Sequence, residues 1–365
     1  MDSQSAIARN YSRLIFHAEY YGFMGINPKV PTKYTYSEME ELIFAFENLL
    51  RKQARFIPVG SSLDEAGFTT MRMLATYKKE IRHDYKKDCR NEWRRALSMA
   101  DILRKILSLQ DCPAFNSVWP HILLLLGNGE IAQNLWSPKE DSHANYVFEL
   151  YTALLALPIS SALDLEPVRT SANGENPDII ATIKGIPWGL ACKVMHSTSA
   201  KSMLDRVRDG IHQIDRCRRI ENGIVVVSLK NVIPHDSIWP VVSEDATGDL
   251  IYLTASSDRL ALQALQAECK RYEVELTEIV GGKDGFRSIF TGTKVEPIIL
   301  AYLCTATSIL RDNRPTFTLI KILCSITVDD FLPPKSRAVA DALNESLHDT
   351  YLDPERAFWR EFRNG

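Results

Sequence analysis

An aspartate and a lysine interrupt two apolar runs between residues 176 and 197. Asp178 opens the first run, and Lys193 lies fifteen positions later, near the middle of the second. A lysine in an apolar run is costly to bury unless its ammonium group has a partner. Carboxylate and ammonium groups set side by side are typical of sites that bind ions or move protons. The two residues therefore suggest a chemical site rather than packing.

Both runs predict β-strands, and the glycine and proline residues at 185–189 predict the connection of a hairpin between them. Side chains alternate between the two faces of a strand, so Ala191 and Lys193 point to one side and Cys192 to the other. Pairing of the strands brings Asp178 to the same patch. The simpler alternative is that Asp178 caps a turn and Lys193 extends its charged end from an edge strand into water.

The order of residues in this region resembles the PD-(D/E)xK nuclease superfamily, which includes restriction endonucleases, junction resolvases and repair nucleases. In that superfamily a Pro-Asp pair opens one strand, and an acidic residue, any residue and a lysine lie on the next. Pro177, Asp178 and Lys193 match this pattern. The resemblance covers residues 145–232, roughly a quarter of the chain.

The resemblance implies hydrolysis of phosphodiester bonds with Mg²⁺ or Mn²⁺ held by oxygen ligands. Asp178 would be one ligand, and Glu149 on the preceding helix would reach the metal directly or through water. Lys193 would orient or help deprotonate the attacking water and offset developing charge. Gln213, on the following helix at 199–221, lies where some members place a polar residue that faces the site.

Ala191 departs from the pattern, because it stands where the second acidic ligand is expected. Three interpretations are open. The acid was replaced by alanine, which gives an inactivated form; or the protein is a degenerate member that binds without cutting; or another acid, for example Glu149 or Glu175, takes its place. The intact pattern around this position, lysine included, favours the first.

Two segments carry basic residues at helical spacing. In residues 77–109 the basic residues recur every four positions and acidic residues are offset by two, which predicts opposite stripes on one helix. A solvated helix with ion pairs is the simpler interpretation, and a track for a phosphate backbone is the alternative. The basic residues of the helix at 199–221 also have two interpretations. They contact the phosphate backbone of DNA, or those near its C-terminal end simply stabilise the helix dipole. The candidate contacts to nucleic acid are Lys86, Arg90, Arg94, Arg206, Arg208 and Arg216.

Composition limits the function classes. The 365 residues are 45% hydrophobic and 24% charged, as in soluble globular proteins, and the length predicts more than one domain. The net charge of −3 excludes a polycation, so binding to nucleic acid needs local basic surface. Seven scattered cysteines without a Cys-x-x-Cys pair argue against a disulfide framework and a structural zinc. Without a leader or a membrane-spanning run, we expect a cytoplasmic protein with no membrane partner.

The pattern predicts an α-helical domain over residues 1–140, an α/β domain over 141–335 and a helical tail over 336–365. No strand is expected before residue 170. Residues 142–160 and 258–272 predict helices, residues 223–233, 249–256 and 317–328 predict strands, and residues 294–312 predict a helix. The expected fold class is α/β, with a restriction-endonuclease-like mixed sheet flanked by helices.

The leading hypothesis is a Mg²⁺- or Mn²⁺-dependent nuclease that cuts DNA, in restriction or anti-phage defence by resemblance alone. The helical domain would grip the substrate, mediate assembly as a homo-oligomer or with a defence subunit, or sense a trigger. Two alternatives remain: a catalytically dead module that binds nucleic acid, and an interaction subunit that binds a partner such as a helicase.

Overall fold

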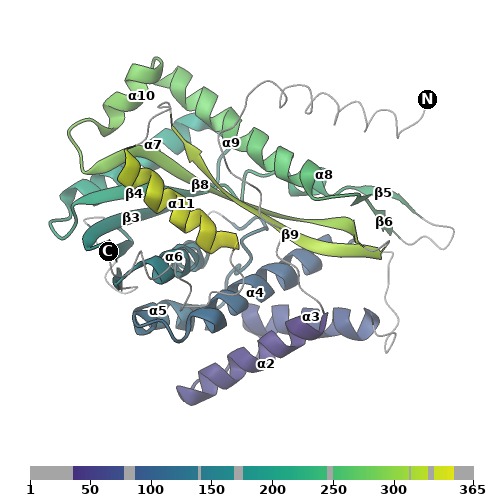
Figure 1. The fold of residues 1–365 in the computed structure, drawn as a ribbon. Coiled ribbons are helices and arrows are strands. Elements are labelled where there is room, and N and C mark those ends of the chain that lie inside the picture. Colours follow the sequence, from purple (N-terminus) through teal and green to yellow (C-terminus); the bar gives the residue numbers. More distant parts are fainter. Residues whose placement is uncertain are drawn as a thin grey trace, which may run out of the picture.

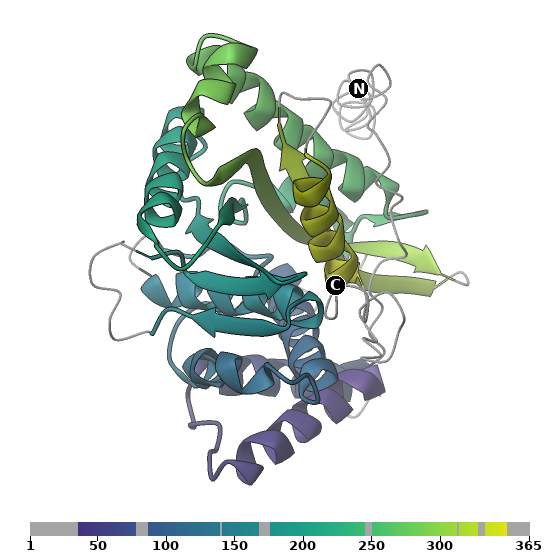
Figure 2. The ribbon, with the colours of Figure 1, turned by 60° about the vertical axis from the view of Figure 1, so that its left-hand side comes forward.

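The computed structural model describes residues 36–77, 87–138, 141–167, 176–244, 250–311, 314–327 and 333–348. These residues form an α/β structure in which a curled mixed sheet separates two groups of helices (Figure 1, Figure 2). The seven strands of this sheet are β1 (Ala162–Leu165), β2 (Ile179–Ile183), β3 (Ile186–Val194), β4 (Asn222–Ser228), β7 (Thr254–Ala255), β8 (Val295–Arg311) and β9 (Arg314–Ile326). A separate two-stranded sheet contains β5 (Val241–Glu244) and β6 (Leu250–Tyr252).

The order of strands in the large sheet is β1-β2-β3-β4-β8-β7, and β9 pairs with β8. The first three strands are antiparallel, whereas β3, β4 and β8 run parallel to one another. The strand β8 is long enough to pair with β4 near its start and with β7 near its end, while β9 follows it as an antiparallel partner. The sheet is therefore mixed, and the β2–β3 hairpin lies toward one of its edges.

Helices cover both faces of the sheet (Figure 1). One face packs against α7 (Ala200–Arg216), α9 (Arg259–Ile279) and α10 (Lys283–Phe290) in an apolar cluster of their own. A second apolar cluster joins the other face to the remaining long helices, and it contains residues from both sides of position 140 in the sequence. Those helices are α2 (Tyr36–Lys52), α3 (Ser62–Tyr77), α4 (Arg90–Leu109), α5 (Phe115–Ile122), α6 (Ser142–Ala156) and α11 (Pro334–His348). Short helical turns lie at η1 (Leu123–Leu126), η2 (Leu157–Ile159) and α8 (His235–Ile238).

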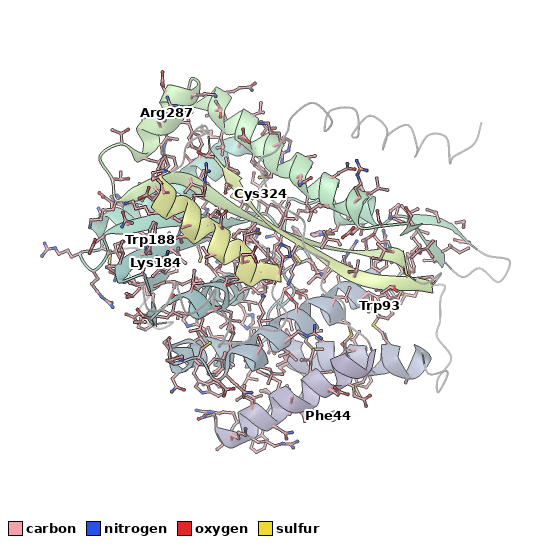
Figure 3. The ribbon with its side chains drawn as sticks, in the orientation of Figure 1. Phe44, Trp93, Lys184, Trp188, Arg287 and Cys324 are labelled. Atoms are coloured by element: carbon pink, nitrogen blue, oxygen red, sulfur yellow. The ribbon has the colours of Figure 1, made fainter. Side chains whose placement is uncertain are left out.

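The turn of the β2–β3 hairpin contains two residues, Lys184 and Gly185. Their φ angles are 52° and 75°, the left-handed values that a tight type I′ hairpin turn requires. Lys184 lies exposed at the tip (Figure 3). The connection is thus shorter than the predicted segment 185–189, and residues 186–189 belong to β3.

Several predicted elements are wrong. In the segment 294–312, predicted as a helix, the described residues Val295–Arg311 form the strand β8, because a long run buried on both faces has no periodicity that distinguishes a strand from a helix. The helix predicted over 77–109 begins only at Arg90 among the described residues, and 87–89 are not helical. The strand β1 lies before residue 170. Residues 249–256 contribute to two sheets, through β6 and β7.

The described part of the chain contains no helix that is both long enough and apolar enough to cross a bilayer. The C-terminal residues from 349 onward, which complete the predicted tail, lie outside the described residues, as does the predicted candidate Lys86.

Candidate functional site

The hairpin places the predicted pair on one face of the sheet. Ile179 pairs with Leu190, and extending this register by one residue sets Asp178 directly beside Ala191. Residues directly opposite in antiparallel strands share a face, and Lys193 follows Ala191 by two positions. Ala191 belongs to the apolar cluster under α7, whereas Cys192 belongs to the cluster on the opposite face. The predicted distribution of these side chains is therefore confirmed.

The carboxylate of Asp178 is held by two groups on β3. Its Oδ2 accepts a hydrogen bond from the backbone N–H of Cys192 at 2.6 Å and lies 3.8 Å from Nζ of Lys193. Asp178 is only 8% exposed. The pKa of Asp178 is raised to about 7, chiefly by burial; the positive charge of Lys193 and the hydrogen bond from Cys192 oppose this rise, and the charges of Glu149 and Glu166 add to it.

The contacts of Lys193 explain how a lysine can lie in an apolar strand. Its side chain is 13% exposed, and Nζ donates a hydrogen bond to Oε1 of Gln213 on α7. The ammonium group thus has a carboxylate and an amide oxygen as partners, so the burial cost of its charge is offset. Asp178 and Lys193 come together as the strand pattern predicted, and Gln213 joins them as the resemblance implied.

Glu166 is a member of this site that the sequence did not indicate. It follows the edge strand β1, and its backbone N–H donates to the carbonyl oxygen of Asp178 at 2.9 Å. The β1–β2 register then sets Glu166, Asp178 and Ala191 in one row across three strands. Burial raises the pKa of Glu166, the nearby charge of Glu149 raises it further, and Lys193 lowers it. Only the sheet register reveals this neighbour, since no motif marks the segment at 162–167.

Glu149 belongs to the opposite group of helices and acts on the site through its charge. It lies on α6, its side chain is 14% exposed, and its charge raises the pKa of both Asp178 and Glu166. Its Oε2 lies 3.5 Å from Nε2 of the buried His121 of α5. The charges of Glu149 and Lys193 therefore act on both Asp178 and Glu166. The alternative acid Glu175 lies outside the described residues.

Ala191 is a tightly packed residue. It is fully buried beneath α7, and a Cβ atom built on Gly210 would lie 3.3 Å from the Cβ of Ala191. The same added atom would lie 3.1 Å from both methyl groups of Val225. A longer side chain at position 191 would therefore have to displace α7 or leave this contact.

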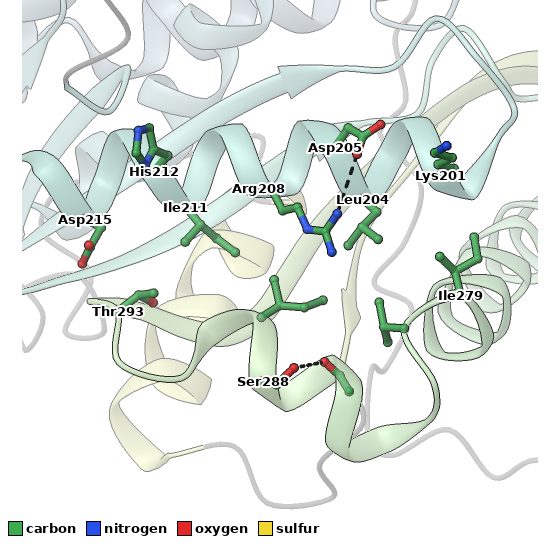
Figure 4. A pocket seen from close by; sticks show the side chains of 13 residues that line it. Lys201, Leu204, Asp205, Arg208, Ile211, His212, Asp215, Ile279, Ser288 and Thr293 are labelled. Carbon is green, nitrogen blue, oxygen red and sulfur yellow. Dashed lines mark hydrogen bonds and ion pairs between the residues drawn. The ribbon is translucent and has the colours of Figure 1, made fainter.

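The arginines of α7 divide between two sides of the helix. At about 100° per residue, Arg206 and Arg216 lie within about 60° of Gln213, whereas Arg208 lies about 140° away. Arg208 lines a groove of about 710 Å³ between α7 and α10, where it faces Asp205 (Figure 4). Only Arg206 and Arg216, both exposed, therefore flank the side of α7 that carries the site.

The two arginines of α4 that were predicted to contact nucleic acid form ion pairs and hydrogen bonds within the protein. Arg94 is 2% exposed, and its Nη1 lies 2.7 Å from Oδ1 of Asp236. Arg90 pairs with Asp88 at 2.7 Å and donates to the carbonyl oxygen of Trp239 at 2.7 Å. The structure does not bring these two residues to the hairpin site, and the ion-paired interpretation describes their contacts.

The donors near Asp178 are hard oxygen atoms, which suit Mg²⁺ or Mn²⁺. Within the described ranges, no three His, Cys, Asp or Glu side chains are gathered closely enough to hold a metal ion by themselves. Mg²⁺ commonly keeps several waters and takes one or two carboxylates, so Asp178 with Glu166 fits that ligand number. Glu149 lies within electrostatic reach of both.

Comparisons of the chain with protein-family models, with curated proteins and with solved structures found no match.

Proposed function

We propose that this protein is a Mg²⁺- or Mn²⁺-dependent nuclease that hydrolyses phosphodiester bonds in DNA, and that it acts in the cytoplasm. The observation that carries the proposal is the row formed by Glu166, Asp178 and Ala191 on neighbouring strands. Lys193 lies beside Asp178 and donates a hydrogen bond to Gln213. Two carboxylates and a buried, partnered lysine on one sheet face are the groups that this chemistry needs.

Glu166 takes the place of the carboxylate that is missing at position 191 in this proposal. Asp178 and Glu166 would hold the cation, with Glu149 as a third acid in reach. A bound cation would polarise the phosphoryl oxygen and lower the pKa of its water. Lys193 would orient the attacking water and offset the charge that develops on the phosphate, while Gln213 fixes the position of Nζ. A role in restriction or anti-phage defence, alone or with a partner subunit, rests on resemblance only.

Cleavage of plasmid DNA in Mg²⁺ or Mn²⁺ tests the proposal. We expect Asp178→Asn and Glu166→Gln each to reduce cleavage by at least about 100-fold, because each removes a negative charge from the cation site. The matched control is Asp164→Asn. Asp164 lies on β1, two residues before Glu166, and pairs with Arg219 rather than with the site. The proposal fails if Glu166→Gln cuts as fast as Asp164→Asn.

A second candidate is a module that binds DNA without cutting it, because the close packing of Ala191 against α7 leaves little room for an acid there. DNA binding by the native chain without cleavage in either cation would favour this candidate. In that case Ala191→Glu would also fail to produce cutting, while Arg206→Ala and Arg216→Ala would weaken binding.

A further inference from the structure

Exposed aromatic side chains gather on α2 and α3, at the outer side of the helical layer (Figure 1, Figure 3). Phe44 of α2 is 50% exposed, and Phe68 of α3 and Phe56 of the connecting loop are each 70% exposed. These three residues define the α2–α3 face. Together they expose on the order of 400 Å², since a Phe side chain presents roughly 200 Å². Apolar patches of this size commonly mark interaction sites, and this one is about half of what each partner contributes to a standard interface.

A cavity of about 220 Å³ lies within the α2–α3 face. Phe44 and Phe68 line it together with the buried Met99 and Leu103 of α4, and most of its other lining residues are apolar. An apolar cavity of about 150 Å³ can bind benzene, so this one has room for an aromatic ring. The face thus offers both projecting rings and a cavity that fits one.

The exposed stripe of α2 changes charge along its length. Six residues between positions 41 and 52 are exposed, and they recur at helical spacing on one side of the helix. In order they are Glu41, Phe44, Ala45, Asn48, Arg51 and Lys52. An acid at the start and bases at the end suit the helix dipole. The dipole does not explain a half-exposed phenylalanine between them.

We propose that the α2–α3 face is the interface of a homodimer with two-fold symmetry. A two-fold interface is self-complementary, because the same surface of both copies takes part. Two α2 helices that cross antiparallel can set Glu41 opposite Arg51 of the partner subunit. Phe44 then falls opposite Asn48 of the partner subunit, because the two helices run in opposite directions. The acidic end of each stripe meets the basic end of the other, and this charge complementarity identifies a second copy of the chain as the partner.

The contacts within one chain leave Arg51 able to take part. Its Nη2 lies 3.2 Å from Oε2 of Glu47, one turn earlier on the same helix, and the arginine side chain is 59% exposed. An exposed ion pair of this kind contributes little to stability. Arg51 can therefore exchange or share this partner when a second helix approaches.

Sedimentation velocity of the full chain at tens of micromolar tests the proposal. We expect a mass near twice the 41.3 kDa of one chain. Phe44→Glu should weaken the dimer by at least about 100-fold, because each dimer then buries two new charges at the centre of the interface. The matched control is Val274→Glu, at a 43% exposed position of α9, which should leave the dimer unchanged. Thermal melts followed by circular dichroism check that both variants are folded.

Charge reversal tests the pairing of the two α2 helices. Glu41→Lys and Arg51→Glu should each weaken the dimer by about 10-fold, because each sets like charges opposite one another. The double variant Glu41→Lys/Arg51→Glu should recover most of the affinity, because it restores opposite charges with their signs exchanged. A dimer formed through any other surface would not show this recovery.

Three outcomes would overturn the inference. A native chain that stays monomeric at tens of micromolar has no such dimer, and the α2–α3 face would then have another occupant, a segment of the same chain or a different protein. Equal dimerisation of Phe44→Glu and Val274→Glu would place the interface elsewhere. A double variant as weak as the single ones would exclude the antiparallel pairing. The measured mass does not depend on cleavage, so the inference and the proposed function can each fail without the other.

Discussion

Asp178 links the site to the pH dependence of stability. Its pKa rises from 3.8 to about 7 on folding, chiefly because it is buried. The unfolded chain then binds fewer protons than the folded one between these values, so the contribution of Asp178 to stability is complete at low pH and is lost as the pH rises. The full loss is on the order of 4 kcal/mol.

Urea unfolding of the metal-free protein from pH 4 to pH 8 measures this effect. Asp178→Asn should reduce the decline in the free energy of unfolding between these limits and should make the protein more stable than the native chain at pH 8. Asp164→Asn, at an exposed acid, should keep the decline. An identical pH dependence in the native chain and in Asp178→Asn would contradict the assignment.

At the scale of single elements, α7 divides its arginines between two surfaces. Arg206 and Arg208 make a matched pair, because each is about half exposed and each has an aspartate three residues away. Removing Arg206 should weaken DNA binding and lower the slope of log K against log salt by about 1, because one phosphate contact is lost. Arg208→Ala should leave both unchanged, because Arg208 faces the groove toward α10.

Fluorescence anisotropy with a labelled duplex at several salt concentrations measures both quantities, with Ca²⁺ in place of Mg²⁺ to suppress cutting. Equal effects of Arg206→Ala and Arg208→Ala would place the DNA over the whole exposed surface of α7. The path proposed here along the Gln213 side would then be wrong.

At the scale of the molecule, a buried charge network connects the helical layer to the sheet. Asp101 of α4 lies 2.6 Å from Nζ of Lys321 on β9 and accepts from Tyr151 of α6 at 2.7 Å. Burial alone would raise the pKa of Asp101, but the charges of Lys321 and Lys105 outweigh it and lower the pKa. Lys105 also donates at 2.7 Å to the carbonyl oxygen of Ser346 in α11.

Breaking this network should destabilise the whole chain. Asp101→Ala leaves Lys321 buried without its carboxylate and should reduce the free energy of unfolding by about 3–5 kcal/mol. The exposed pair Asp284 and Arg287 is the control, and Asp284→Ala should cost less than about 1 kcal/mol. A similar cost for both variants in urea denaturation would show that the network does not couple the layers.

The amino-acid sequence by itself determined the local geometry of the site. Two apolar strands joined by a short turn must place Asp178 and Lys193 on one face, because strand alternation and hairpin pairing are set by nearby residues. The helical periodicity of residues 199–221 likewise placed Gln213 on a helix after the hairpin. These parts depend on contacts between segments that are close in sequence.

Only the tertiary structure decided which distant groups complete the site. Glu166 reaches Asp178 through the pairing of an edge strand, His121 meets Glu149 through the packing of two helices, and Arg94 is buried against Asp236. Residues 295–311 form a strand because its partners, β4 and β9, lie on either side of it. The strand register and the packing between distant segments depend on how the whole chain buries its apolar surface. Local periodicity does not encode that arrangement.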